Sequence, residues 1–450
     1  MFEGGGFSNG RSRAEPVDSD QVMPTESEVV VIGGGIVGVS AALCLAEQGV
    51  SVTLCEKGVI AGEASGRAIG WIDSQYMSPA KMELISRAKT LWGAMDERVA
   101  GTTGYRRTGM ISVFGDEDHA GMAEHWLDRV RGMSGVDARV LTEREALELL
   151  PEGAEAPLGA LYQPSDGVAE PTSAAPAIAR AAQRKGAVLL QHCAVRKIET
   201  VAGRVDAVIT EKGAIRTRHV VVAGGVWSPS LLRPLGLQLP QLHAHASAMR
   251  FRAESTSGPN TSALLPEGIY RSNGDGSYTL GAVNGAAPIT PATLRHFFSF
   301  LPAIRRMWSE IDPVFSLDTF KHELSLLREQ PADSVSVYER IRFFEPQIRQ
   351  RFLEKVMGDF AAQYPLFRQG VVEERWSGAL VSTPDNMPVI SSVDSVAGLV
   401  LGTGLYYGLT MGPAAGEALA AIITGKKADI DLSGYRYSRF HDGTKLQFQD

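Results

Sequence analysis

Three glycines and one acid near the start of the chain have the types and spacing of a site that binds nucleotide phosphates. Gly33, Gly35 and Gly38 form the pattern G-x-G-x-x-G, and Glu56 follows after one further segment. Gly33 permits a tight turn, Gly35 lets the backbone approach a pyrophosphate, and Gly38 allows close packing of helix on strand. The carboxylate of Glu56 can accept hydrogen bonds from an adenosine ribose and would repel a 2′-phosphate. This pattern predicts an adenine dinucleotide other than NADP.

The elements that must position these residues are visible in the same stretch. Residues 29–32 form a β-branched run typical of a buried strand. A small-residue helix is expected from about Ile36 to Gln48, with Gly49 as its C-cap, and a second strand from Val50 to Cys55. The helix N-terminus would present free N–H groups to the phosphates.

Other segments predict more of the site and a second sheet. The loop after Glu56 contains Gly62, Ser65, Gly66, Arg67 and Gly70, and a dinucleotide larger than NAD needs such a loop to cradle its far phosphate and ring; an unrelated surface loop is the alternative. A second glycine turn, 224–225, ends a strand where ligands of open α/β sheets bind. Alternating residues around a turn at 275–276 indicate an antiparallel sheet, followed by a long helical block over 291–363. A final helix is expected to begin near Gly412–Pro413.

Composition excludes several classes of function. The formal charge of −7 (44 basic and 51 acidic residues) and the absence of a basic stripe argue against a nucleic-acid partner. Cys44, Cys55 and Cys193 are too few and too scattered for a disulfide framework or a zinc site, so we interpret them as buried thiols in a reducing compartment and expect no metal. Residues 1–27 are polar and predict a disordered tail without a signal peptide. Since no apolar run reaches the roughly 18 residues of a membrane span, we expect a cytoplasmic protein, with peripheral association at the inner face of the membrane left open.

Seven motifs in this order resemble the FAD-dependent D-amino-acid oxidase and dehydrogenase superfamily, most closely its D-amino-acid-dehydrogenase-like (DadA-like) and glycine-oxidase-like branch. They are "VVVIGGGIVGVSAALCLAEQG", "GEASGRAIGWI", "LYQPSDGVAEPT", "VVVAGGVWSP", "DGSYTLG", "RWSGALVSTPDNMPVI" and "GLVLGTGLYYGLTMGPAAG". The resemblance covers residues 28 to about 440. It implies an α/β fold in which a GR2-type, Rossmann-like FAD-binding domain (28–100, 151–238 and 370–440) is interleaved with an α+β substrate domain (101–150 and 239–369) built on a mostly antiparallel sheet.

The resemblance also implies the residues that hold FAD. They are Gly33, Gly35, Gly38, Glu56, Lys57, Ser65, Arg67, Val195, Gly224, Gly404, Gly408, Leu409 and Thr410. The final helix would point its positive end at the N1/C2=O edge of the flavin and stabilise negative charge there. Some related enzymes attach flavin through a C-terminal cysteine; because no cysteine follows Cys193, we expect noncovalent FAD.

In this family an amine donates hydride from its α-carbon to flavin N5, and water hydrolyses the imine to a 2-oxo acid or aldehyde. Arg271 is the candidate partner of a substrate carboxylate, or else a solvated strand charge. Tyr406 and Tyr407 stand where relatives often carry "GHSGHG"-like residues, which puts a borrowed proton-transfer role for histidine in doubt. His243 and His245 share one strand face, as a base or as structural residues; we take His245 as the catalytic candidate.

Rival functions stay open at this stage. The same scaffold could oxidise a secondary amine, an N-methyl amino acid, an opine or a 2-hydroxy acid. A flavin subunit of a heteromeric opine or amine dehydrogenase would relay electrons to a partner, and an exposed apolar patch would favour it. An NAD-dependent dehydrogenase is weakened by the segments 62–70 and 404–413. The substrate is expected to be a small amino acid or amine, with oxygen, a quinone or a protein as electron acceptor.

Overall fold

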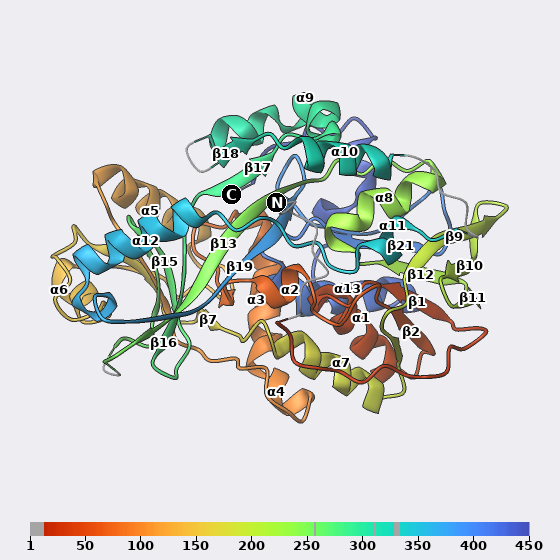
Figure 1. Ribbon diagram of the computed structural model, residues 1–450, viewed down its shortest axis with the longest axis horizontal. Coiled ribbons are helices and arrows are strands. Elements are labelled where there is room, and N and C mark those ends of the chain that lie inside the picture. The colour runs from red at the N-terminus through yellow and green to blue at the C-terminus, as the bar shows by residue number, and fades with distance from the viewer. Residues whose placement is uncertain (1–12, 256–257, 309–310, 328–333, 450) are drawn as a thin grey trace, which may run out of the picture.

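The computed structural model describes residues 13–255, 258–308, 311–327 and 334–449, which form a mixed α/β fold around two large sheets (Figure 1). The first sheet has six strands in the order β20-β21-β12-β1-β2-β8, and all neighbours are parallel except β20 with β21. Its strands are β1 Val29–Ile32, β2 Val52–Cys55, β8 Val188–Leu190, β12 His219–Val222, β20 Val389–Ser392 and β21 Leu399–Thr403.

The register of this sheet brings the two glycine turns together. Strand β1 is fully buried, as its β-branched run predicts, and Ile32 pairs with Val222 of β12 on one side and Cys55 of β2 on the other. The residues that follow, Gly33 and Glu56 among them, therefore meet at one edge of the sheet.

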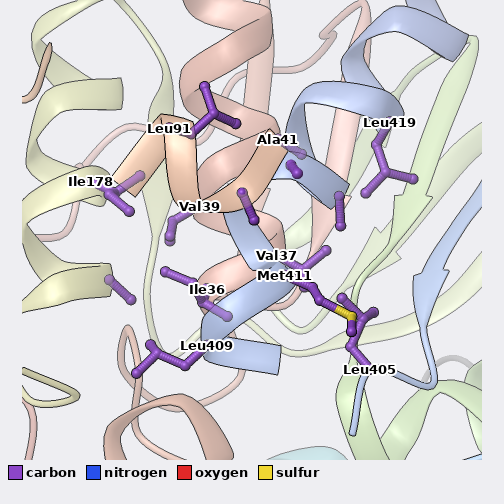
Figure 2. Packing of buried hydrophobic residues seen from close by; sticks show 14 of the residues in the cluster. Ile36, Val37, Val39, Ala41, Leu91, Ile178, Leu405, Leu409, Met411 and Leu419 are labelled. Atoms are coloured by element: carbon purple, nitrogen blue, oxygen red, sulfur yellow. The ribbon is translucent and has the colours of Figure 1, made fainter. Parts of the chain in front are cut away.

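Helix α1 (Ile36–Glu47) lies at the centre of the helical layer on this sheet, and Figure 2 shows its apolar side chains packed between α3 (Pro79–Gly93), α7 (Ala174–Arg184) and α13 (Gly408–Thr424). Small residues allow α1 and α13 to approach closely, since a Cβ on Gly416 would lie only 2.5 Å from the Cβ of Ser40. This packing fixes the N-termini of α1 and α13 relative to the sheet edge.

The second sheet has ten strands and is mostly antiparallel; its parallel pairs are β4 with β14 and β17 with β18. Its strands are β4 Met110–Val113, β5 Arg139–Leu141, β6 Ala160–Gln163, β13 Leu242–Ala253, β14 Ser262–Leu265, β15 Gly268–Ser272, β16 Ser277–Gly281, β17 Gly285–Pro288, β18 Ile311–Val314 and β19 Gly370–Ser382. The hairpin predicted at residues 275–276 is confirmed by the antiparallel pairing of β15 with β16. Apolar residues of α12 (Gln350–Gln363) pack on this sheet.

The remaining elements are short. Two small sheets consist of β9 Val195–Val201, β10 Arg204–Thr210 and β11 Gly213–Arg216, and of β3 Trp71–Ile72 and β7 Gly167–Val168. The other α-helices are α2 Ala64–Arg67, α4 Met95–Arg98, α5 Glu117–Val130, α6 Glu143–Leu147, α8 Ser228–Leu232, α9 Pro291–Arg306, α10 Leu317–Leu326 and α11 Val337–Arg340. The 3₁₀ turns are Gly225–Trp227, Arg233–Leu235, Pro365–Phe367, Ser433–Tyr435 and Tyr437–Phe440. Along the described residues, none of the helices has the length and apolar character to span a membrane.

The expected disordered tail is wrong for residues 13–27, while residues 1–12 lie outside the described part. The segment follows the edge strand β8: the Asp20 N–H donates to the Leu189 carbonyl at 2.8 Å, and the Asp20 carboxylate accepts from the Leu189 N–H at 2.7 Å. Farther upstream, the Arg13 guanidinium lies 3.6 Å from the centre of the Trp376 ring. The polar composition that suggested disorder instead satisfies an edge strand's free backbone groups.

Two boundaries differ from those expected. Strands β6 and β19 pair with the large sheet, although residues 151–238 and 370–440 were expected in the FAD-binding domain, because strand partners far apart in sequence leave no local signal. The helical block expected over 291–363 is interrupted by β18 and several loops.

Helix α13 begins at Gly408, about one turn earlier than the expected start near Gly412–Pro413. Pro413 has no N–H to bond the Leu409 carbonyl one turn back. The indole N–H of Trp92 donates to that carbonyl at 3.2 Å and to the Thr410 carbonyl at 3.1 Å. A tertiary donor thus allows the helix to extend upstream of its proline, toward the sheet edge.

Candidate functional site

A cleft opens at the sheet edge where β1, β2, β12 and β21 end, and its empty space, with the solvent at its mouth included, is about 1020 Å³. Nine of the residues predicted to hold FAD line it: Gly33, Gly35, Glu56, Lys57, Ser65, Val195, Gly224, Gly404 and Gly408. The four others predicted, Gly38, Arg67, Leu409 and Thr410, lie outside this lining. The structure therefore brings residues from distant parts of the chain to one site.

The three motif glycines have different tasks. Gly33 adopts φ +110°, and a Cβ there would lie 2.4 Å from the Ala223 carbonyl oxygen. A Cβ on Gly38 would lie 1.9 Å from the Gly33 oxygen, so Gly38 serves the packing of α1 on β1. Gly35 has ordinary extended dihedrals (φ −75°, ψ 175°) and its missing Cβ leaves space in the cleft. Of the three, Gly35 alone serves the cleft rather than the fold.

The N-terminus of α1 and the α2 loop meet in this cleft. The Ile36 N–H donates to Ser65 Oγ at 2.9 Å, and Ser65 Oγ lies 3.0 Å from the position of a Cβ on Gly35. Free N–H groups and the helix dipole make this a favourable place for an anion, with a hydroxyl beside it. The predicted partnership of the glycine motif with the residue 62–70 loop is consistent with this geometry.

Glu56 lies at the end of β2 with both carboxylate oxygens engaged. They accept the N–H groups of Gly34 and Gly58, each at 2.7 Å. Burial raises the pKa of Glu56, while Lys57 and the two N–H groups oppose the shift. A carboxylate has further lone pairs, so these bonds orient Glu56 and leave it able to accept ribose hydroxyls.

Lys57 and Glu63 form a charged wall of the cleft. Lys57 Nζ lies 2.5 Å from Glu63 Oε1 and 4.5 Å from the centre of the Trp227 ring, and Trp227 Nε1 donates to Glu63 at 3.0 Å. The Lys57 ammonium is thus paired with Glu63 and Trp227. The FAD contact predicted for Lys57 would therefore involve its backbone and the aliphatic part of its side chain. Glu63 and Trp227 could not be predicted as part of the site from the sequence, because the contacts that place them join separate loops.

Arg67, at the end of α2, and Trp71, at the start of β3, provide buried donors. Arg67 Nη1 donates to Glu345 at 2.8 Å, whereas Arg67 Nη2 and Trp71 Nε1 are buried without a hydrogen-bond partner among the described residues. Buried donors without partners are costly. A polar ligand in this region would satisfy them, so the donors fit a group such as FAD.

Arg271 is buried rather than solvated, with 4% of its surface exposed. Its Nη2 donates to Glu170 Oε2 at 2.8 Å and to Asn273 Oδ1 at 2.6 Å, and its Nη1 donates to the Ala169 carbonyl at 2.9 Å. Nη1 also lies 1.9 Å from the position of a Cβ on Gly70, which follows the α2 loop. Arg271 therefore lies beside the segment that leads to Trp71, but its charge is already neutralised by Glu170.

The remaining catalytic candidates flank the cleft without lining it. Tyr406 and Tyr407 stack edge to face, with ring centres 4.9 Å apart, between the lining residues Leu405 and Gly408. They directly precede α13, and both their placement beside the flavin and their roles stay predictions.

His243 and His245 share one face, as predicted. Their ring nitrogens lie 3.0 Å apart, and His243 Nε2 lies 2.8 Å from Glu323. Burial and the charges of His243 and Arg349 lower the pKa of His245 to about 3, so it is neutral. His245 packs edge-on against Phe344 and is not part of the lining, which favours a structural role over that of a base.

Comparison with known proteins agrees with this geometry. The model of a family described as FAD dependent oxidoreductase (DAO) matches residues 28–422. The structure of L-amino acid deaminase from Proteus myxofaciens, in complex with anthranilate, is similar with a TM-score of 0.93 and 33% identity, covering 98% of this chain and 100% of that one.

Sequences of characterised enzymes are also similar to this chain. Glycine oxidase from Pseudomonas putida is 25% identical over 91% of this chain and 97% of its own length. Mitochondrial sarcosine dehydrogenase from Mus musculus is 23% identical over 95% of this chain, which spans only 42% of that protein.

Proposed function

We propose a reaction from the premise that this chain belongs to the FAD-dependent oxidoreductase (DAO) family. The chain oxidises the C–N bond of an L-amino acid to give an imino acid, and water then hydrolyses the imino acid to a 2-oxo acid and ammonia. The chain is an FAD-dependent enzyme of amino-acid or amine oxidation. The observation that carries the L-amino acid is the similarity, at 33% identity over 98% of the chain, to an L-amino acid deaminase. Addition of L-amino acids to the FAD-loaded chain should release ammonia and 2-oxo acid in equal amounts.

The six-stranded sheet with α1, α7 and α13 is proposed to be the GR2-type FAD-binding part, and the ten-stranded sheet the substrate part. Bound noncovalently, FAD supplies the acceptor for the hydride that leaves the substrate's α-carbon. The chain's residues do the rest: the N-terminus of α1 with Ser65 holds phosphate, Glu56 orients ribose, and the N-terminus of α13 presents its positive end to the ring. We place the protein in the cytoplasm.

The role of Arg271 separates two interpretations that kinetics can distinguish. If its remaining Nη1–H donates to the substrate carboxylate, Arg271→Met should raise KM for the amino acid at least about tenfold, the effect of one lost charge-assisted bond. The amine that lacks the carboxylate should be oxidised equally by both proteins. Steady-state kinetics with an amino acid and its decarboxylated amine measure this.

The matched control is Glu170→Gln, which removes the partner of Arg271 and keeps the guanidinium. It should lower thermal stability without raising KM. Equal KM values for wild type and Arg271→Met, with a fall in Tm in both variants, would assign Arg271 to structure alone.

The second candidate function concerns the electron acceptor that reoxidises the flavin. Seven large apolar side chains of the described residues are exposed between residues 294 and 324: Leu294, Phe297, Phe298, Trp308, Phe315, Leu317 and Leu324. Figure 1 shows α9, β18 and α10 at one edge of the molecule, and α9 carries Arg295, Arg305 and Arg306 without an acid. An apolar surface with adjacent basic residues suits an anionic membrane. This favours a membrane-bound quinone over oxygen as the acceptor.

Vesicle binding tests this second candidate. Phe297→Ser/Phe298→Ser should reduce the fraction of protein that sediments with phosphatidylglycerol vesicles by at least about fivefold, because two aromatic anchors are lost. Val371→Ser, at an exposed apolar residue on β19, serves as the control and should bind like wild type. Equal sedimentation of wild type and the double variant would rule this surface out.

A further inference from the structure

Asp73 is a buried carboxyl that the proposed reaction does not use. It directly follows β3 and exposes 6% of its surface. Its Oδ1 lies 3.1 Å from Thr410 Oγ1, and its backbone N–H points to the same oxygen at 3.4 Å. Thr410 belongs to the first turn of α13, next to the cleft-lining Gly408. Asp73 therefore contacts the helix turn that faces the proposed FAD site.

The number of donors and acceptors around the Thr410 hydroxyl indicates whether Asp73 is neutral or ionised. Thr410 Oγ1 also lies 3.2 Å from the Trp71 carbonyl oxygen, which can only accept. A hydroxyl has one hydrogen to give and two lone pairs to receive. With ionised Asp73, two acceptors would compete for that hydrogen. With neutral Asp73, the carboxyl O–H and the Asp73 N–H donate to Thr410 and Thr410 donates to Trp71, so the hydrogen and both lone pairs of the Thr410 hydroxyl are used.

The charged groups near Asp73 also favour its neutral form. Asp166, from the turn between β6 and β7, is fully buried, and Lys89 of α3 lies 2.8 Å from its Oδ1. Ser74 donates to Asp166 with both its N–H (2.9 Å) and its hydroxyl (2.7 Å). Two buried carboxyls thus share one cation, and the cation contacts Asp166. Among the described residues no ion pair joins Asp73 to a cation.

We propose that Asp73 is a positioning residue, held as a neutral carboxylic acid, whose proton completes a hydrogen-bond chain through Thr410 to the Trp71 carbonyl and so holds the first turn of α13 at the cleft. The inference rests on the proposed FAD site. Burial and the charge of Asp166 raise the pKa of Asp73 from 3.8 to about 7, against the lowering effects of Thr410, the Asp73 N–H and Lys89.

The pKa of Asp73 differs between the folded and the unfolded chain, and this difference sets how stability changes with pH. The unfolded chain loses the Asp73 proton near its ordinary pKa of 3.8, whereas the folded chain keeps it until about pH 7. The stability that Asp73 contributes is therefore full below about pH 4 and is lost as the pH rises to about 7. Above that pH, a buried charge replaces the hydrogen-bond chain.

The experiment compares wild type with Asp73→Asn, whose amide donates to Thr410 at every pH. The FAD dissociation constant is measured by flavin fluorescence on serial dilution of the loaded chain, and the Tm is measured with and without FAD. For wild type we expect FAD affinity to fall about tenfold between pH 6 and 9, with a midpoint near 7, the effect of about one pKa unit of linkage. The FAD affinity of Asp73→Asn should equal that of wild type at pH 6 and should not change at higher pH. The Tm of Asp73→Asn, relative to that of wild type, should increase as the pH rises to about 7.

Two further variants complete the test. Thr410→Val, which breaks the chain, should bind FAD weakly at every pH, and Asp394→Asn, at an exposed acid, should follow the wild-type curve. A wild-type pH dependence in Asp73→Asn, or weak FAD binding by that variant at pH 6, would overturn the proposal. Because no amino acid enters these measurements, their failure is separate from failure of the proposed reaction.

Discussion

Purified Gly35→Val protein is expected to be folded and colourless. Gly35 has dihedrals that valine adopts without strain, and among the described residues, its chain neighbours aside, the nearest atom to a Cβ there is Ser65 Oγ at 3.0 Å. The isopropyl group would instead fill the space that a pyrophosphate needs beside the N-terminus of α1. We expect at least about a hundredfold loss of FAD affinity, equivalent to roughly 3 kcal/mol.

Flavin absorbance after purification and a titration with FAD measure this loss, while circular dichroism and the Tm report on the fold. Gly121→Val is the matched control, because no atom of the described residues beyond its own stretch of α5 lies within 4 Å of a Cβ at Gly121. That variant should keep its FAD. A yellow Gly35→Val protein with full FAD content would show that the cleft is not the FAD site.

Lys89→Met is expected to be the most destabilising of the variants considered. Lys89 and Asp166 form an ion pair at 2.8 Å with side chains 7% and 0% exposed, and Lys89 Nζ also donates to Ser165 Oγ at 2.6 Å. Removal of one partner leaves a buried carboxylate without its cation, which costs about 3–5 kcal/mol. A fall in Tm of roughly 5 °C or more in a thermal melt is the expected result.

The control is Lys355→Met, which breaks an ion pair with Asp359 whose lysine is 75% exposed. Surface pairs contribute roughly 0–1 kcal/mol, so its Tm should stay near that of wild type. The double variant Lys89→Met/Asp166→Leu removes both charges and should regain part of the loss. Equal melting of Lys89→Met and Lys355→Met would contradict the view that this buried cation balances the Asp166 carboxylate.

The nucleotide-binding unit could be predicted from sequence because its signals are local. Strand β1 matches its expected bounds, and α1 ends within one residue of those expected. The turn at Gly33 and the packing at Gly38 each depend on glycine for reasons visible in the spacing. The position of Gly224 beside Gly33 followed from the same rule, because ligand sites occur at the carboxyl ends of parallel strands.

What could not be predicted depends on distant partners. The start of α13 requires Trp92 to replace the hydrogen bond that Pro413 lacks, and residues 13–27 are ordered by the edge of β8. Glu63 enters the cleft wall through Lys57 and Trp227. Asp73 becomes notable only when Thr410, some 340 residues away, is placed beside it. None of these contacts leaves a periodicity or spacing in the sequence.

The catalytic residues were harder to predict than those for FAD. Arg271 and His245 have residue types suited to chemistry, yet the structure pairs the first with Glu170 and packs the second against Phe344. A residue's type shows what it can do, whereas its burial and partners decide what it does.

Anaerobic mixing of the FAD-loaded chain with a panel of L-, D- and N-alkyl amino acids, opines and hydroxy acids tests the central claim most directly. The visible flavin band should bleach with one or more L-amino acids, and readmission of air should then show whether oxygen accepts the electrons. A protein that stays yellow with every compound would contradict amino-acid oxidation and favour a flavin subunit that depends on a partner.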